Sequence, residues 1–215
     1  MRHEGTDRLF QYWTSRRDGR AAPLRADIAP AAIASVLSNT FILEETAAHM
    51  KYRLAGTRLC CVFGRELRGM PFADGFEASD RKLVRDALSA VHQDHAVMTA
   101  ELHASDTRER MVGLELMLLP LADEQPRILG SLQFLDNPYW LGADPLGKMR
   151  LTSLSYLDSD KQFVVLQNRP PVMLPEYRPA GGRRLFHVLE GNGLTSIGTP
   201  RPDRTFSVID GGRDS

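Results

Sequence analysis

The chain has 215 residues, of which 42% are hydrophobic, and this is enough for one domain of ordinary size with an appendage. Its 27 Lys and Arg residues balance 27 Asp and Glu residues, so no surplus of positive charge is present to hold a nucleic-acid backbone. No stretch approaches the roughly 18 consecutive apolar residues of a membrane span, and the N-terminus lacks the apolar segment of a secretory signal. We therefore expect a cytoplasmic protein with no membrane span and no nucleic-acid partner.

Two helices are predicted before residue 40. The first begins at Thr6 and Asp7, which favour a helix start, and ends by Gly19. It carries an apolar stripe at helical spacing, formed by Leu9, Phe10 and Trp13. The second is predicted between residues 27 and 37, because Pro30 stands near its start and Ile33, Val36 and Leu37 share one helical face.

The aromatic stripe of the first helix requires a partner surface. Aromatic side chains bury about 150–250 Å² each, so leaving them in water forfeits several kcal/mol. Leu9, Phe10 and Trp13 are therefore interface candidates, and we expect a homodimer or a docked partner protein. The alternative is that the helix folds back onto the sheet of its own domain.

The elements after residue 40 alternate between strands and helices. Strands are predicted at 40–43 and 51–54, and glycines break residues 56–76 into short helical turns. A long amphipathic helix opens at Ser79 and Asp80 and ends near residue 94. Three strands then form a meander at 96–102, 112–118 and 127–135, and Pro120 is expected to end the second of them.

The composition changes after residue 137, where Pro and Gly interrupt every candidate element. We therefore divide the chain into N-terminal helices at 1–39, a core at 40–137 and a tail with little regular structure at 138–215. Residues 177–215 in particular are expected to make few contacts.

Two motifs resemble those of a known family. The run YRLAGTRL at 52–59 with FGRELRG at 63–69, and FQYW at 10–13 with RRDG at 16–19, resemble single-PAS-domain proteins of alpha-class proteobacteria. The resemblance covers about residues 6–136. It implies an α+β fold, in which short helices and one long connecting helix cover a five-stranded antiparallel sheet. It also implies a bacterial cytoplasmic regulator in signal transduction that holds a small ligand or docks signalling proteins, usually as a dimer.

A ligand pocket, if the domain has one, is expected between the sheet and its short-helix face. Its candidate walls are the apolar positions of the strands and of the facing helices: Tyr52, Leu54, Cys60, Phe63, Leu88, Val91, Leu114, Leu116, Leu132 and Phe134. If these side chains fill the interior, the alternative of an interaction adaptor without a ligand is favoured. An enzyme with an unfamiliar site is the third hypothesis, but no catalytic motif is found and no catalytic residue is predicted.

Cofactor chemistry finds little support in the sequence. His92 and His95 are similar in placement to the axial histidine of haem-binding PAS proteins, although cationic side chains are also favoured at a helix C-terminus, and we predict no metal site. Flavin is not expected, because Cys60 and Cys61 lie in RLCCVF and not in the cysteine motif of flavin photosensors. Both cysteines are predicted to be reduced and partly buried.

Overall fold

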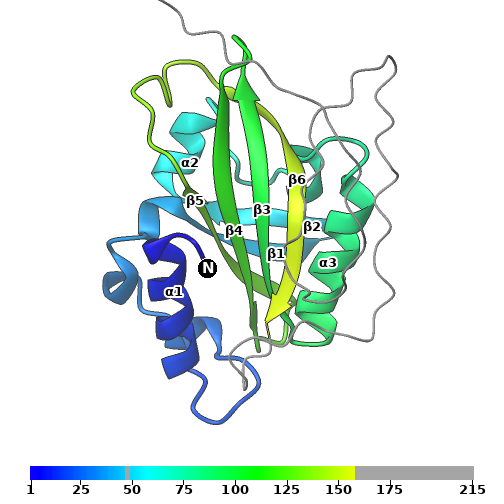
Figure 1. Ribbon diagram of the computed structural model, residues 1–215. Helices are drawn as coiled ribbons and strands as arrows, with labels where there is room; N and C mark the ends of the chain where they lie inside the picture. Colours follow the sequence, from blue (N-terminus) through cyan, green and yellow to red (C-terminus); the bar gives the residue numbers. More distant parts are fainter. Residues whose placement is uncertain (47–48, 158–215) are drawn as a thin grey trace, which may run out of the picture. The chain divides into compact units, whose positions relative to one another are not determined.

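The computed structural model describes residues 1–46 and 49–157. These residues form a six-stranded antiparallel sheet in the order β2-β1-β5-β4-β3-β6 (Figure 1). The strands are β1 (Thr40–Thr46), β2 (His49–Ala55), β3 (Val97–Asp106), β4 (Met111–Leu121), β5 (Arg127–Phe134) and β6 (Leu146–Leu157). The expected α+β class and antiparallel sheet are confirmed, but the sheet has six strands instead of five.

Helical elements cover both faces of the sheet (Figure 1). On the face that we call the inner face lie α2 (Thr57–Val62), the 3₁₀ turn η4 (Phe72–Gly75) and α3 (Arg81–Gln93). On the opposite, outer face lie α1 (Glu4–Ser15) and the 3₁₀ turns η1 (Arg25–Asp27), η2 (Pro30–Ile33) and η3 (Leu37–Asn39). Side chains of the central strands are therefore buried on both sides.

Strand β4 shows this double burial directly. Leu114, Leu116 and Leu118 belong to the inner core, whereas Met117 and Leu119 belong to the outer core. Successive side chains of a strand point to opposite faces, so a strand covered on both faces is apolar at almost every position. This explains the nearly continuous apolar run in the sequence of β4.

The predicted end of β4 at Pro120 is wrong, because the strand continues to Leu121. Its pairing with β3 runs only to Leu118, so the missing N–H of Pro120 does not interrupt that ladder. The Pro120 carbonyl accepts a hydrogen bond of 2.9 Å from the indole Nε1 of Trp13. Pro120 thus lies just beyond the part of β4 that pairs with both β3 and β5. Its carbonyl accepts the hydrogen bond that holds α1 against the sheet.

The predicted second helix between residues 27 and 37 is also wrong, because this part of the chain forms η1, η2 and η3. Ile33 and Val36 still face the outer core, as their spacing indicated, while Leu37 is 42% exposed. Short 3₁₀ turns place residues three apart on one side, so the apolar spacing alone does not distinguish them from an α-helix. The correction is important for the site described below.

Strand β6 occupies part of the segment for which little regular structure was expected. It pairs antiparallel with β3, from Val97 opposite Leu157 to Asp106 opposite Leu146. The Asp80 carboxylate at the start of α3 accepts a hydrogen bond of 2.8 Å from the backbone N–H of Leu151. The strand therefore extends the sheet and ties it to α3. The prediction for residues 177–215 lies outside the described residues.

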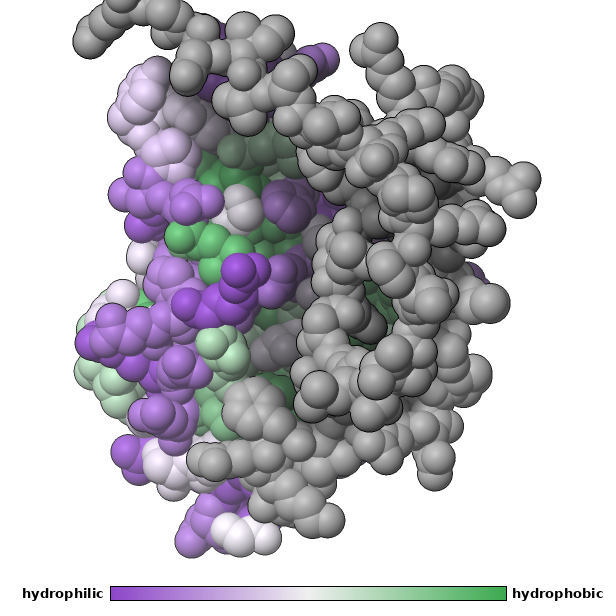
Figure 2. All heavy atoms as spheres, viewed as in Figure 1, coloured by the Kyte–Doolittle hydropathy of each residue, from purple (hydrophilic) through white to green (hydrophobic). Residues whose placement is uncertain are grey.

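The interface prediction for α1 is corrected by its packing. Leu9 and Trp13 are fully buried on the outer face of the chain's own sheet, and Phe10 is half-buried with its ring stacked 6.2 Å from that of Trp13. The opposite side of the helix is polar, and Figure 2 shows mainly hydrophilic side chains over the left-hand side, where α1 lies. The helix therefore folds back onto its own domain, which was the alternative considered.

No helix in the described ranges, 1–46 and 49–157, is long and apolar enough to cross a membrane.

Candidate functional site

The inner face holds most of the side chains predicted to line a pocket. Eight of the ten candidates lie in one buried cluster. They are Tyr52, Phe63, Leu88, Val91, Leu114, Leu116, Leu132 and Phe134. Cys60 is partly buried and packs against this cluster, whereas Leu54 lies elsewhere. The prediction of a shared apolar face therefore holds for nine of the ten residues.

These side chains fill much of the space that a ligand would need. The rings of Phe41, Tyr52, Phe72 and Phe76 contact one another with centroids 5.3 to 5.5 Å apart. Burial raises the pKa of Tyr52 well above its ordinary range. The pocket beside Tyr52 and Phe63 has a volume of about 10 Å³, which is the space of a single water molecule. At these residues the predicted cavity is thus closed by aromatic packing.

A much larger space lies on the outer face, and we call it the outer groove. Its volume is about 560 Å³. One wall is the segment of 3₁₀ turns, and the other is formed by β1, β2 and the start of α2. The lining residues are Arg25, Ile28, Pro30, Ile33, Ala34, Leu37, Ser38, Thr40, Phe41, Ile42, Leu54, Ala55, Gly56, Thr57 and Leu129.

A register shift in the sheet places Leu54 in this groove. Leu54 pairs with Ile42 of the outer core, whereas Tyr52, two residues earlier, pairs with Leu43 of the inner core. The shift between Ile42 and Leu43 is a β-bulge that leaves Arg53 as an extra residue. Residues two apart, which normally share a face, therefore point to opposite faces. The prediction that Leu54 lines an inner pocket is wrong for this reason.

The groove remains open because the N-terminal segment covers the sheet incompletely. Leu54, Ile42 and Leu129 form an apolar row across three adjacent strands. Ile42 and Leu129 are buried under the N-terminal elements, but Leu54 is 48% exposed. With Leu37 of the opposite wall, it leaves large apolar side chains in contact with water. Such an exposed apolar surface is typical of a binding site.

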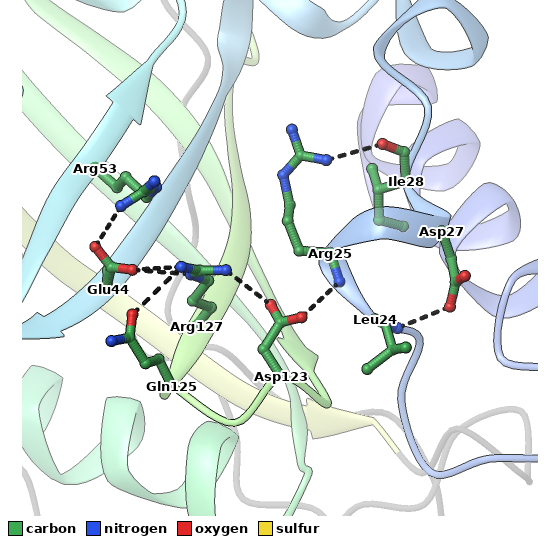
Figure 3. Close-up of polar contacts among 9 residues, drawn as sticks. All are labelled: Leu24, Arg25, Asp27, Ile28, Glu44, Arg53, Asp123, Gln125 and Arg127. Carbon is green, nitrogen blue, oxygen red and sulfur yellow. Dashed lines mark hydrogen bonds and ion pairs between the residues drawn. The ribbon is translucent and has the colours of Figure 1, made fainter.

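An ion-pair chain borders the apolar row on the outer face (Figure 3). The Arg127 guanidinium donates to Glu44 Oε1 at 2.7 and 2.9 Å and lies 3.5 Å from Asp123 Oδ2. Arg53 donates to the other Glu44 oxygen at 2.8 Å. The hydrogen bonds from Arg127 lower the pKa of Glu44, and the same pairing raises the pKa of Arg127. The pairing therefore favours the charged forms of both Glu44 and Arg127.

Arg25 connects the ion-pair chain to the outer groove. Its backbone N–H donates to Asp123 Oδ1 at 3.1 Å, which holds η1 against the turn between β4 and β5. Its side chain turns away from that carboxylate, and the guanidinium donates to the Ile28 carbonyl at 3.0 Å (Figure 3). The guanidinium is thus directed along the groove wall and not into the ion-pair chain.

The histidines considered for haem lie apart from the outer groove. His92 is in the last turn of α3, and His95 follows the helix as an exposed residue with a φ of 51°. His103 Nδ1 lies 2.7 Å from Thr152 Oγ1 on β6. Among the residues with a described position, no three His, Cys, Asp or Glu side chains form a group suited to a metal ion. Cys60 and Cys61 are free thiols, and Cys61 is exposed.

A family model of the PAS domain matches residues 1–133. The chain belongs to the PAS-domain family. The matched residues include α1, the 3₁₀ segment and almost all of β5, so the outer groove is built entirely from the PAS domain. Strand β6 lies beyond the match. No curated protein matches the chain.

Sequence reasoning missed most of the groove. Ile33 and Leu37 were recognised as apolar positions but were assigned to a helix, and Arg25 was not singled out. The groove depends on a bulge and on the path of a 3₁₀ segment, neither of which has a periodic signal. The exposure of Leu37 on one wall and of Leu54 on the other follows only from the three-dimensional structure.

Proposed function

We propose that this PAS domain is a sensory module that binds a small apolar molecule in the outer groove and transmits its occupancy to signalling proteins. The volume of about 560 Å³, with a mainly apolar lining, carries the proposal. Pockets for small molecules typically span about 300–1,000 Å³, with apolar walls and a few placed polar groups. The space beside Tyr52 and Phe63 is filled, and the hollow of about 340 Å³ beside Leu88 and His92 is smaller and more polar in its lining, so the outer groove suits an apolar molecule better.

The position of the groove suits a sensor. One wall belongs to the segment of residues 25–38 and the other to the sheet, so a bound molecule would bridge two parts of the domain. A ligand shifts a conformational equilibrium by its differential affinity for the two states. Binding across these walls would favour the state in which the segment is held against β1 and β2. In this proposal the protein is a non-catalytic bacterial regulator in the cytoplasm that acts as a homodimer.

A second candidate function is docking of a partner protein's apolar side chains in the same groove. The exposure of Leu37 and Leu54 favours it, since anchors of protein interfaces fill such apolar recesses. Leu54→Glu should then abolish partner capture, while Met111→Glu, at an even more exposed apolar residue of a strand outside the groove, should not. Saturable binding of a small molecule distinguishes the first function from this one.

The test uses amide chemical shifts of the full chain during titration with decanol, a neutral apolar probe, below its solubility limit. We expect saturable shifts confined to residues 25–42 and 54–57 and to Leu129 and its neighbours. Ala34→Trp should weaken or abolish them, because Ala34 lines the groove and an indole there occupies part of the space that the probe needs. Ala32→Trp is the matched control, since Ala32 is exposed on the same turn but does not line the groove. Shifts centred on Phe63 and Leu88, or no saturable shift, would refute the proposal.

A further inference from the structure

The outer groove has a single charged residue among the described residues that line it, and that residue is Arg25. Its side chain is half-buried. Within the described part of the chain, its guanidinium donates one hydrogen bond, to a neutral acceptor, the Ile28 carbonyl. A guanidinium has five N–H donors, so most of its donor capacity is unused. The groove therefore combines an apolar floor with one cation at its wall.

Three other half-buried arginines of the described chain are neutralised by carboxylates, whereas Arg58 donates to the neutral Asn137 Oδ1 at 2.6 Å and lies over the Phe134 ring. Arg127 pairs with Glu44 and Asp123, and Arg110 pairs with Asp106 at 2.6 Å and with Asp144 at 2.8 Å. Arg20 pairs with Asp27 at 2.6 Å. Arg25 lies close to Asp123 in the chain fold, yet it offers this carboxylate only its backbone N–H.

The local charge count agrees with this picture. Three arginines, Arg25, Arg53 and Arg127, meet two carboxylates, Glu44 and Asp123, at this corner of the described structure. Both carboxylates are engaged by Arg127. Among these described residues the Arg25 guanidinium forms no ion pair with either carboxylate, and Arg25 lines the groove. A half-buried cation without a counter-ion is costly, and an anionic ligand group would relieve that cost.

We propose that the groove selects an amphipathic monocarboxylate, whose carboxylate pairs with Arg25 and whose hydrocarbon part lies along Ile28, Ile33 and Leu54. The planar fork of a guanidinium matches the two oxygens of a carboxylate and can bind both. The apolar row then holds the tail, and the cation fixes its direction. This inference rests on the proposed function, because it names the chemical class of ligand for the same site.

The experiment compares decanoate with decanol, which has the same chain length and no charge. Both are titrated calorimetrically into the full chain at neutral pH, below the concentration at which decanoate forms micelles. We expect decanoate to bind at least about 10-fold more tightly than decanol, because a charge-assisted hydrogen bond contributes about that much affinity. Arg25→Met should remove this preference, so that the ratio of the decanoate and decanol affinities falls to about 1. Arg25→Lys should retain part of it, because the charge remains while the fork is lost.

Arg68→Met is the matched control, since Arg68 is exposed and lies outside the groove, and it should leave both affinities unchanged. Equal binding of decanoate and decanol would overturn this inference and leave the proposed function standing. A decanoate preference that survives Arg25→Met would overturn it as well. If neither probe binds, both the inference and the proposed function fail. Circular dichroism confirms that each variant is folded before titration.

Discussion

Replacing Trp13 by alanine tests whether α1 is part of the domain core. Trp13 is fully buried, its Nε1 donates to the Pro120 carbonyl at 2.9 Å, and its ring stacks on Phe10. Removing a buried aromatic side chain costs about 3–5 kcal/mol in unfolding free energy. The loss of the indole donor also leaves a buried carbonyl without its partner. The expected loss is a large share of the roughly 5–15 kcal/mol that stabilises a typical domain.

The assay is urea unfolding of the full chain, followed by circular dichroism and by the fluorescence of Trp140, the second tryptophan. The midpoint should fall with little change in slope, and thermal unfolding should begin about 10 °C lower or more, at roughly 2–4 °C per kcal/mol. Phe10→Ala is the comparison variant and should cost less, because Phe10 is only half-buried.

A loss below about 1 kcal/mol for Trp13→Ala would contradict the reasoning, because such a value is typical of surface positions. Conversion of a dimer to a monomer in sedimentation, with unchanged unfolding, would assign the stripe to an interface. The two outcomes cannot be confused, because burial in the core and burial at an interface affect different measurements. The expected result is therefore a loss of stability without a change in mass, as the burial of Trp13 within its own domain requires.

Two other predictions follow from particular contacts. Glu44 has a pKa below its ordinary value of 4.5, so its pairing with Arg127 stabilises the fold above that pH and is lost as the pH falls through the lower folded value. Acid unfolding of Glu44→Gln should therefore show a weaker loss of stability below about pH 4.5 than the parent, and an identical pH profile would refute this. A Cβ at Gly130 would lie 2.2 Å from the Phe41 ring, whereas at Gly113 the nearest atom would lie 3.4 Å away. Gly130→Ala should therefore lower the unfolding free energy by about 1–3 kcal/mol or more. Gly113→Ala should lower it by less than about 0.5 kcal/mol. Equal effects of the two variants in urea unfolding would show that Phe41 moves aside.

Much of the fold could be predicted from periodic patterns. The stripe of α3 and the alternation in β3 each reflect burial against one surface, so the pattern identifies the element. Gly64 and Gly69 lie in the segment 56–76 that glycines were expected to break into short turns, and both have positive φ values, of 63° and 82°. These features are local. The six strands were not all recognised, because β6 is an edge strand whose solvent side carries Lys148 and Arg150 and whose burial is partial.

The inner face shows a different limit. Periodicity correctly brought Phe63, Leu88 and Leu116 to one cluster, because it reports which side of an element is buried. It does not report whether buried side chains meet or leave a void. That depends on how closely the layers approach, and here the four aromatic rings close the space. A pocket and a packed core have the same sequence pattern, so only the structure could separate them.

The outer groove depends on one residue of register. Had β2 paired with β1 without the bulge, Leu54 would share the inner face with Tyr52, and the row with Ile42 and Leu129 would end at β1. The extra residue, Arg53, turns Leu54 outward and also brings its own guanidinium to Glu44. The same bulge thus supplies the apolar floor of the groove and a cation that engages Glu44. Because Arg53 and Arg127 occupy Glu44, and Arg127 also lies beside Asp123, the Arg25 guanidinium is left to face the groove.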